Sequence, residues 1–160
     1  MPALRPLLFR ALFAASFVPG LLRGEEAPLP LDRYAKVSVE TARTSIYIGS
    51  VTLAMPTFTR HGITYSTTYA ARVFPYFFYT EKGSLSLDVP DEDLRKLERG
   101  ETITFTGRAR TTDGEDRRIE GRAQPADATS GKLKVRVFVS PKIQLIFNTS
   151  YRFTTEPDRK

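Results

Sequence analysis

The sequence predicts an all-β protein, an antiparallel β-sandwich or small barrel with one short α-helix, preceded by a signal peptide. Three observations predict this class. Short segments alternate apolar and polar side chains, glycine-containing turns separate those segments, and one short segment has helical spacing. The 160 residues suffice for one domain, which we place at residues 36–153.

Alternation with period two is the signature of strands that bury one face. In residues 132–139, four aliphatic side chains alternate with Lys132, Lys134 and Arg136. Residues 45–54 break their alternation at Gly49, which suggests a β-bulge. The predicted strands cover residues 36–41, 45–54, 63–69, 84–89, 102–106, 132–139 and 144–153.

One helix is predicted over residues 91–99. Asp91 follows a proline and can cap the first turn, and acidic residues occupy the beginning of the segment. Leu94 and Leu97 lie three residues apart on one face, and Gly100 ends the helix. Calcium binding by these acids is the alternative, although the spacing lacks the glycine and distal glutamate of a calcium loop.

Residues 1–24 have the pattern of a signal peptide, with Arg5 and Arg10 before an apolar stretch. The alternative is a helix of the mature fold. Residues 25–35 contain two prolines without periodicity and are predicted to be a linker, and residues 154–160 a polar tail. The protein is therefore expected to be exported, to the periplasm or the extracellular space.

Charge and composition exclude several kinds of chemistry. Removing residues 1–24 takes away three arginines and no acid, which lowers the net charge from +6 to +3 and weakens the case for a nucleic-acid partner. The chain has no cysteine and one histidine, His61, so disulfides, thiolate metal sites and sites needing two histidines are excluded. We expect no cofactor and no metal.

Candidate catalytic groups are few. Hydrolysis by paired carboxylates needs two acids in one cleft, and Glu40 and Glu120 lie within strand-like runs with nothing in the sequence to bring them together. We therefore expect a protein that is not an enzyme, with a carboxylate-dependent hydrolase as the alternative.

Arginines gather in a predicted hairpin at residues 101–124. Guanidinium groups there could bind phosphate, acidic glycan or lipid headgroups, and a solvated sheet face neutralised by nearby acids is the alternative. The arginines concerned are Arg108, Arg110, Arg117, Arg118 and Arg122.

The most unusual segment is residues 72–80, which hold five aromatic residues within six positions. A strand buried on both faces is one interpretation, and an aromatic groove for a lipid chain or sugar ring is the other. The candidate ligand-binding residues are Phe74, Tyr76, Phe77, Phe78 and Tyr79.

These observations predict a non-enzymatic module of the cell envelope or periplasm, which binds an apolar or amphipathic ligand or a protein partner. The expected partners are a lipid, a glycan or an envelope protein, with peripheral contact to a membrane. A small outer-membrane barrel is a further alternative, because residues 147–153 alternate aromatic and polar side chains.

Overall fold

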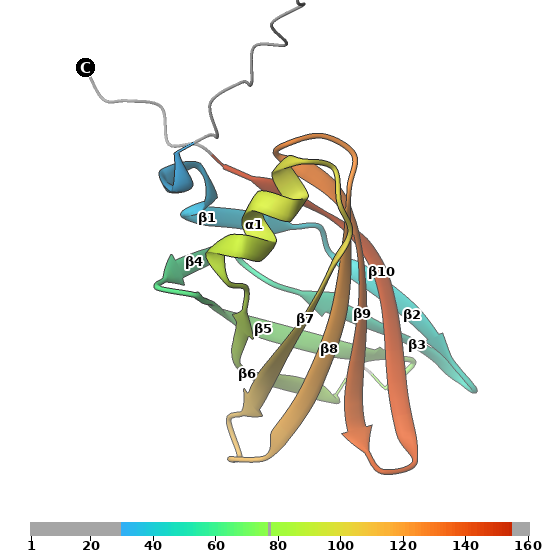
Figure 1. The fold of residues 1–160 in the computed structure, drawn as a ribbon. Coiled ribbons are helices and arrows are strands. Elements are labelled where there is room, and N and C mark those ends of the chain that lie inside the picture. The colour runs from blue at the N-terminus through green and yellow to red at the C-terminus, as the bar shows by residue number, and fades with distance from the viewer. Residues whose placement is uncertain (1–29, 77, 155–160) are drawn as a thin grey trace, which may run out of the picture.

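A computed structural model describes residues 30–76 and 78–154, which form ten strands, one α-helix and one 3₁₀-helix (Figure 1). The signal-peptide prediction and most of the predicted tail lie outside these residues, as does Phe77. The elements are η1 (Leu31–Tyr34), β1 (Lys36–Val39), β2 (Ala42–Ile46), β3 (Gly49–Ala54), β4 (Phe58–His61), β5 (Thr64–Phe74), β6 (Thr80–Asp88), α1 (Asp91–Glu98), β7 (Ile103–Thr111), β8 (Asp116–Pro125), β9 (Ser130–Ser140) and β10 (Ile143–Phe153).

The strands close into an antiparallel barrel. Pairing runs from β5 through β4, β1, β10, β9, β8, β7 and β6 and returns to β5, which makes a ring of eight strands. The hairpin of β2 and β3 extends the sheet, with β3 paired to the second half of β5. The sequence leaves a sandwich and a small barrel open, and this closed pairing corresponds to the barrel.

The alternation of side chains decides which face of each strand is inside. In β9, Leu133 is buried and Val135 and Val137 are half-buried, whereas Lys132 and Lys134 are exposed. Every strand of a closed barrel has one inward face, so a period of two gives each strand an apolar interior side. The strand prediction for residues 132–139 is confirmed.

One predicted strand is in fact a hairpin. Residues 45–54 contain the end of β2, a turn at Tyr47 and Ile48, and β3. Gly49 has a φ of 112°, a conformation that favours glycine, and it begins β3 after the turn. The bulge predicted at Gly49 is therefore wrong, because the break in alternation there marks a reversal of the chain.

A helical cap closes one end of the barrel. α1 lies across this end and η1 lies nearby (Figure 1). Leu94 and Leu97 of α1 and Tyr34 of η1 are buried in the core. The helix is where the sequence predicts it, but Asp91 is its first residue rather than its cap, and Asp91 pairs with Arg60. The packed domain thus includes residues that the sequence assigns to the linker.

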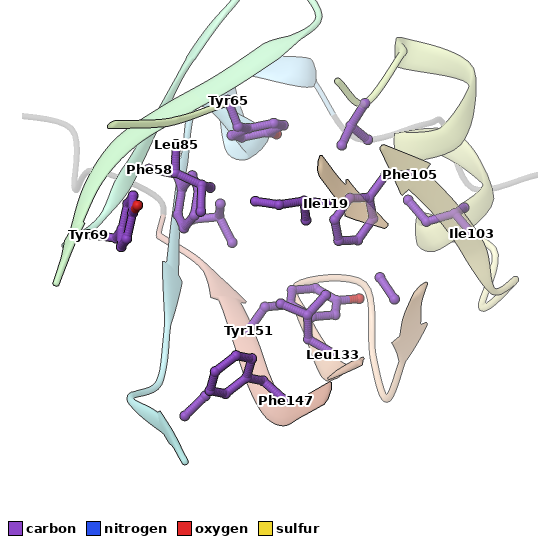
Figure 2. Packing of buried hydrophobic residues seen from close by; sticks show 14 of the residues in the cluster. Phe58, Tyr65, Tyr69, Leu85, Ile103, Phe105, Ile119, Leu133, Phe147 and Tyr151 are labelled. Atoms are coloured by element: carbon purple, nitrogen blue, oxygen red, sulfur yellow. The ribbon is translucent and has the colours of Figure 1, made fainter. Parts of the chain in front are cut away.

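The interior has two unlike halves. Near α1 it is filled by large rings, among them those of Phe58, Tyr65, Phe105 and Tyr151 (Figure 2), and the spaces between them measure only about 60 Å³. At the other end several inward side chains are small, among them Ala71, Val73 and Ala109. The turns that join β2 to β3, β5 to β6, β7 to β8 and β9 to β10 all lie at that second end, which we call the open end.

Among residues 30–76 and 78–154, no helix combines the length and apolarity needed to cross a membrane.

Candidate functional site

A cavity of about 290 Å³ occupies the open half of the barrel. Its lining is mostly apolar and comes from the inward faces of β2, β3 and β5–β10. An eight-stranded barrel is just wide enough for its own side chains or one small ligand, so small inward residues decide which of the two it holds. The lining residues are Ile46, Val51, Leu53, Tyr69, Ala71, Val73, Tyr79, Glu81, Leu85, Ala109, Arg117, Ile119, Val137, Val139, Ile143, Leu145 and Phe147.

Small side chains create this space. The lining includes Ala71 and Val73 on β5, Ala109 on β7 and Val137 and Val139 on β9, whose side chains fill less space than the rings of the aromatic half. Protein interiors are otherwise close-packed, and the aromatic half of this barrel is an example. The cavity therefore lies where several inward positions carry alanine or valine instead of an aromatic residue.

A polar cluster lies inside the apolar wall. The Tyr69 hydroxyl donates to Glu81 Oε1 at 2.8 Å, and Arg117 Nη2 donates to Glu81 Oε2 at 3.2 Å and also to Glu115. Arg117 and Glu81 side chains are 13% and 21% exposed. Arg117 lies on β8 and Glu81 on β6, and Ala109 of the intervening β7 pairs with Arg117, so its small side chain leaves room for the guanidinium to cross.

The cluster has a defined protonation state. Burial, followed by the hydrogen bond to the Glu81 carboxylate, raises the pKa of Tyr69, so its hydroxyl stays protonated. Burial opposes the charge of Arg117, but hydrogen bonds to Glu115 and Glu81 outweigh this effect and raise the pKa of its guanidinium. Two carboxylates therefore face one guanidinium, and the cluster has no surplus positive charge.

One donor of this cluster has no acceptor. The Arg117 Nε–H is buried and has no hydrogen-bond partner within the described residues. A buried unpaired donor costs about 1–3 kcal/mol, so an acceptor oxygen placed beside it would be stabilised. Arg117 lines the cavity, but its Nε has no surface open to it, so a bound molecule reaches this N–H only if the Arg117 side chain shifts.

The aromatic segment predicted as a ligand site lies at the mouth of the cavity. Tyr79 lines the cavity, and Phe74, Tyr76 and Phe78 are exposed in and beside the β5–β6 turn. Phe77 lies outside the described residues. The described residues do not form a strand buried on both faces, because β5 ends at Phe74 and the turn to β6 follows.

The predicted arginine group is divided by the wall of the barrel. Arg108 and Arg118 are exposed and face each other across β7 and β8, and Arg118 lies 3.9 Å from the ring centre of Phe138. Arg110 lies 4.0 Å from Asp116. Arg122 lies on the outer face beside Lys134, so Arg117 alone of the five points inward.

The acidic candidates lie outside the barrel. Glu40 is exposed between β1 and β2, and Glu120 lies 3.4 Å from Arg118. Glu120 shares a shallow outer depression with Asp88 and Asp93, which is also lined by Arg122, Lys134 and Arg136. Within residues 30–76 and 78–154, no group of three acidic or histidine side chains is placed to hold a metal ion.

The acids at the beginning of α1 are engaged in separate contacts. Asp91 pairs with Arg60, Asp93 with Lys96 at 2.8 Å, and Asp88 accepts from the Thr64 hydroxyl at 2.7 Å. Each of these carboxylates, including that of Asp88 at the end of β6, therefore has a basic or hydroxyl partner of its own.

Sequence reasoning missed most of the cavity lining, including Tyr69 as a polar contact and Glu81. The sequence does contain a signal for the two charged residues of the polar cluster. Arg117 is in phase with Ile119 and Ala123, and Glu81 is in phase with Leu85, so alternation alone would have placed both inside.

Comparisons of the chain with family models, with curated proteins and with solved structures found no match.

Proposed function

We propose that this protein is a non-enzymatic, exported binding module whose barrel holds one apolar or amphipathic small molecule. The observation that carries the proposal is the 290 Å³ cavity with apolar walls and one internal polar cluster. Its volume is near the lower end of the roughly 300–1,000 Å³ found for small-molecule sites.

The polar cluster suggests which end group the ligand has. A small shift of the Arg117 side chain would present its unpaired Nε–H to a ligand, while Glu81 and Glu115 already neutralise the guanidinium. A neutral acceptor oxygen, as in an ester, ketone or alcohol, gains this hydrogen bond without repulsion. A carboxylate would stand beside two like charges, so we propose a neutral lipid-like ligand.

Export is supported by the signal-peptide pattern of residues 1–24. The outward faces of β7, β8 and β9 carry charged side chains, including Arg108, Arg118, Lys132 and Lys134. Charge on the outer face of a strand is costly in a hydrocarbon layer, so these residues favour a water-facing module over the outer-membrane alternative.

A dye-displacement experiment tests the proposal. The neutral dye N-phenylnaphthylamine is titrated into the full chain, and methyl laurate, lauryl alcohol and laurate then compete with it. We expect saturable dye binding, displacement by the ester and the alcohol, and binding of laurate weaker by about tenfold, equivalent to about 1.4 kcal/mol.

Two variants show whether the dye occupies the cavity. Val137→Phe places a ring inside the cavity, and Ser84→Phe places the same ring on the outer face of β6. Dye affinity should fall about tenfold or more in the first and stay unchanged in the second. Absence of saturable binding, or equal affinity in the two variants, would contradict the proposal.

A further inference from the structure

Apolar side chains exposed to solvent are concentrated at the open end. Of nine large exposed hydrophobic residues among those described, eight lie in or within four residues of the turns there, and the ninth, Ile63, lies near α1 at the other end. Seven of the eight surround the mouth of the cavity, and we call them the apolar rim. The rim consists of Tyr47, Ile48, Phe74, Tyr76, Phe78, Tyr79 and Ile143.

The rim comes from three separate turns that the fold brings together. Ser50 pairs with Phe74, which joins the β2–β3 turn to the β5–β6 turn, and Ile143 with Tyr79 lines the same cavity. Several rim residues are far more exposed than a core residue could be, with Tyr47 at 102% and Phe78 at 88%. Contiguous exposure of this kind marks an interaction surface rather than ordinary surface variation.

The charges around the apolar rim indicate what kind of surface the rim binds. The three segments that carry the rim, residues 42–54, 72–80 and 138–146, contain Arg43, Arg72 and Lys142 and no acidic residue. The acids of the open end lie elsewhere, in the β7–β8 turn and inside the cavity. Tyrosine and phenylalanine flanked by cations is the composition that favours the interface of a bilayer containing anionic lipids.

We propose that the apolar rim docks on a bilayer surface that contains anionic phospholipids, with the mouth of the cavity facing the membrane. Phe78 and Tyr47 enter the headgroup region, and Arg43, Arg72 and Lys142 contact lipid phosphates. This inference goes beyond the proposed function, because docking requires no ligand in the cavity.

The absence of cysteine allows the rim to be labelled one position at a time. Phe78→Cys, Ile143→Cys and Ile63→Cys are each labelled with an environment-sensitive fluorophore in the full chain. Vesicles of phosphatidylglycerol and phosphatidylcholine are then added, and phosphatidylcholine vesicles serve for comparison. The readout is local, so it reports the rim whatever residues 1–24 contribute to membrane binding.

We expect the labels at positions 78 and 143 to shift to shorter wavelength on the anionic vesicles while the label at position 63 does not. Phe78→Asp should weaken vesicle binding about tenfold or more, because the phenylalanine ring that enters the bilayer is lost. Arg72→Gln and Lys142→Gln should each weaken it about fivefold. Ile63→Asp, at the opposite end, should leave it unchanged.

Three results would overturn the inference. These are labels at positions 78 and 143 that do not shift on vesicles that bind the protein, a shift that is equal on zwitterionic vesicles, and a shift that occurs without vesicles as the chain self-associates. Dye binding separates this inference from the proposed function. Phe78→Asp should still bind N-phenylnaphthylamine in solution, and a wild-type chain that docks but binds no dye would refute the proposed function alone.

Discussion

Phe105 on β7 lies over Gly121 on β8, its paired neighbour, so closely that a Cβ at residue 121 would come within 2.0 Å of the ring. Gly121 is not among the glycines with positive φ, so the glycine is needed for space rather than for backbone conformation. The ring is buried and fills part of the aromatic half of the barrel.

Gly121→Ala should therefore destabilise the protein by about 1–3 kcal/mol, because the ring must move out of a packed interior. Urea unfolding measures the loss. Phe105→Leu removes the clashing ring, so the double variant should be more stable than the two single losses predict, by about 1 kcal/mol. Strict additivity of the two changes would show that the contact is not the cause.

The Glu81–Arg117 pair should be strongly coupled. Replacing one partner leaves the other half-buried without its counter-charge, so Glu81→Gln and Arg117→Met should each cost about 1–3 kcal/mol. The double variant should cost less than the two together. A coupling free energy below about 0.5 kcal/mol in urea unfolding would mean that the pair contributes nothing to the fold.

Asp127 should make stability depend on pH in the acid range. Hydrogen bonds from the Ser130 hydroxyl and from the backbone and side chain of Thr129 lower its pKa to about 2 from an ordinary 3.8. A lowered pKa in the folded state stabilises the protein above the ordinary value, and this contribution is lost as the pH falls from about 4 to about 2.

The test is to compare wild type with Asp127→Asn across this range. The wild type should be more stable at pH 7, and the difference should shrink as the pH falls towards 2. A carboxyl titration followed by NMR gives the pKa directly. A difference in stability that is the same at both ends of the range would contradict the account.

Packing of α1 against the aromatic half of the barrel should contribute strongly to the stability of the fold. Leu94 is fully buried, so Leu94→Ala should cost about 2–5 kcal/mol by urea unfolding. Glu92 on the same helix is 80% exposed and pairs with Lys96 at 3.3 Å, so Glu92→Ala should cost about 0.5 kcal/mol or less. Equal effects of the two substitutions would mean that α1 does not pack as described.

Local patterns could predict the strands and the helix but not the closure of the barrel. Alternation in residues 132–139 and the leucine spacing in 91–99 each depend on one short segment, and both predictions are confirmed. Closure depends on pairing between β1 and β10, in which Val37 faces Phe153. No short-range pattern in the chain encodes a contact between residues so far apart.

The candidate site was harder to predict because composition and alternation point in different directions there. The aromatic segment at residues 74–79 resembles a buried strand by composition, yet its described aromatic residues Phe74, Tyr76, Phe78 and Tyr79 are exposed and form part of the apolar rim. Arg117 is charged and still points inward, since Glu81 and Tyr69 on neighbouring strands supply its polar surroundings. Composition indicates the aromatic segment and the arginine group as candidate sites, whereas the positions of their side chains depend on closure of the barrel.

The central claim is that a ligand chain lies inside the open half of the barrel. The most direct measurement is NMR of side-chain methyl groups with the methyl ester of a nitroxide-labelled fatty acid bound. The account predicts that the methyls of Leu85, Ile119 and Val137 broaden while those of Leu94 and Leu97 do not. Broadening confined to rim residues such as Ile48 and Ile143, or no broadening at all, would contradict it.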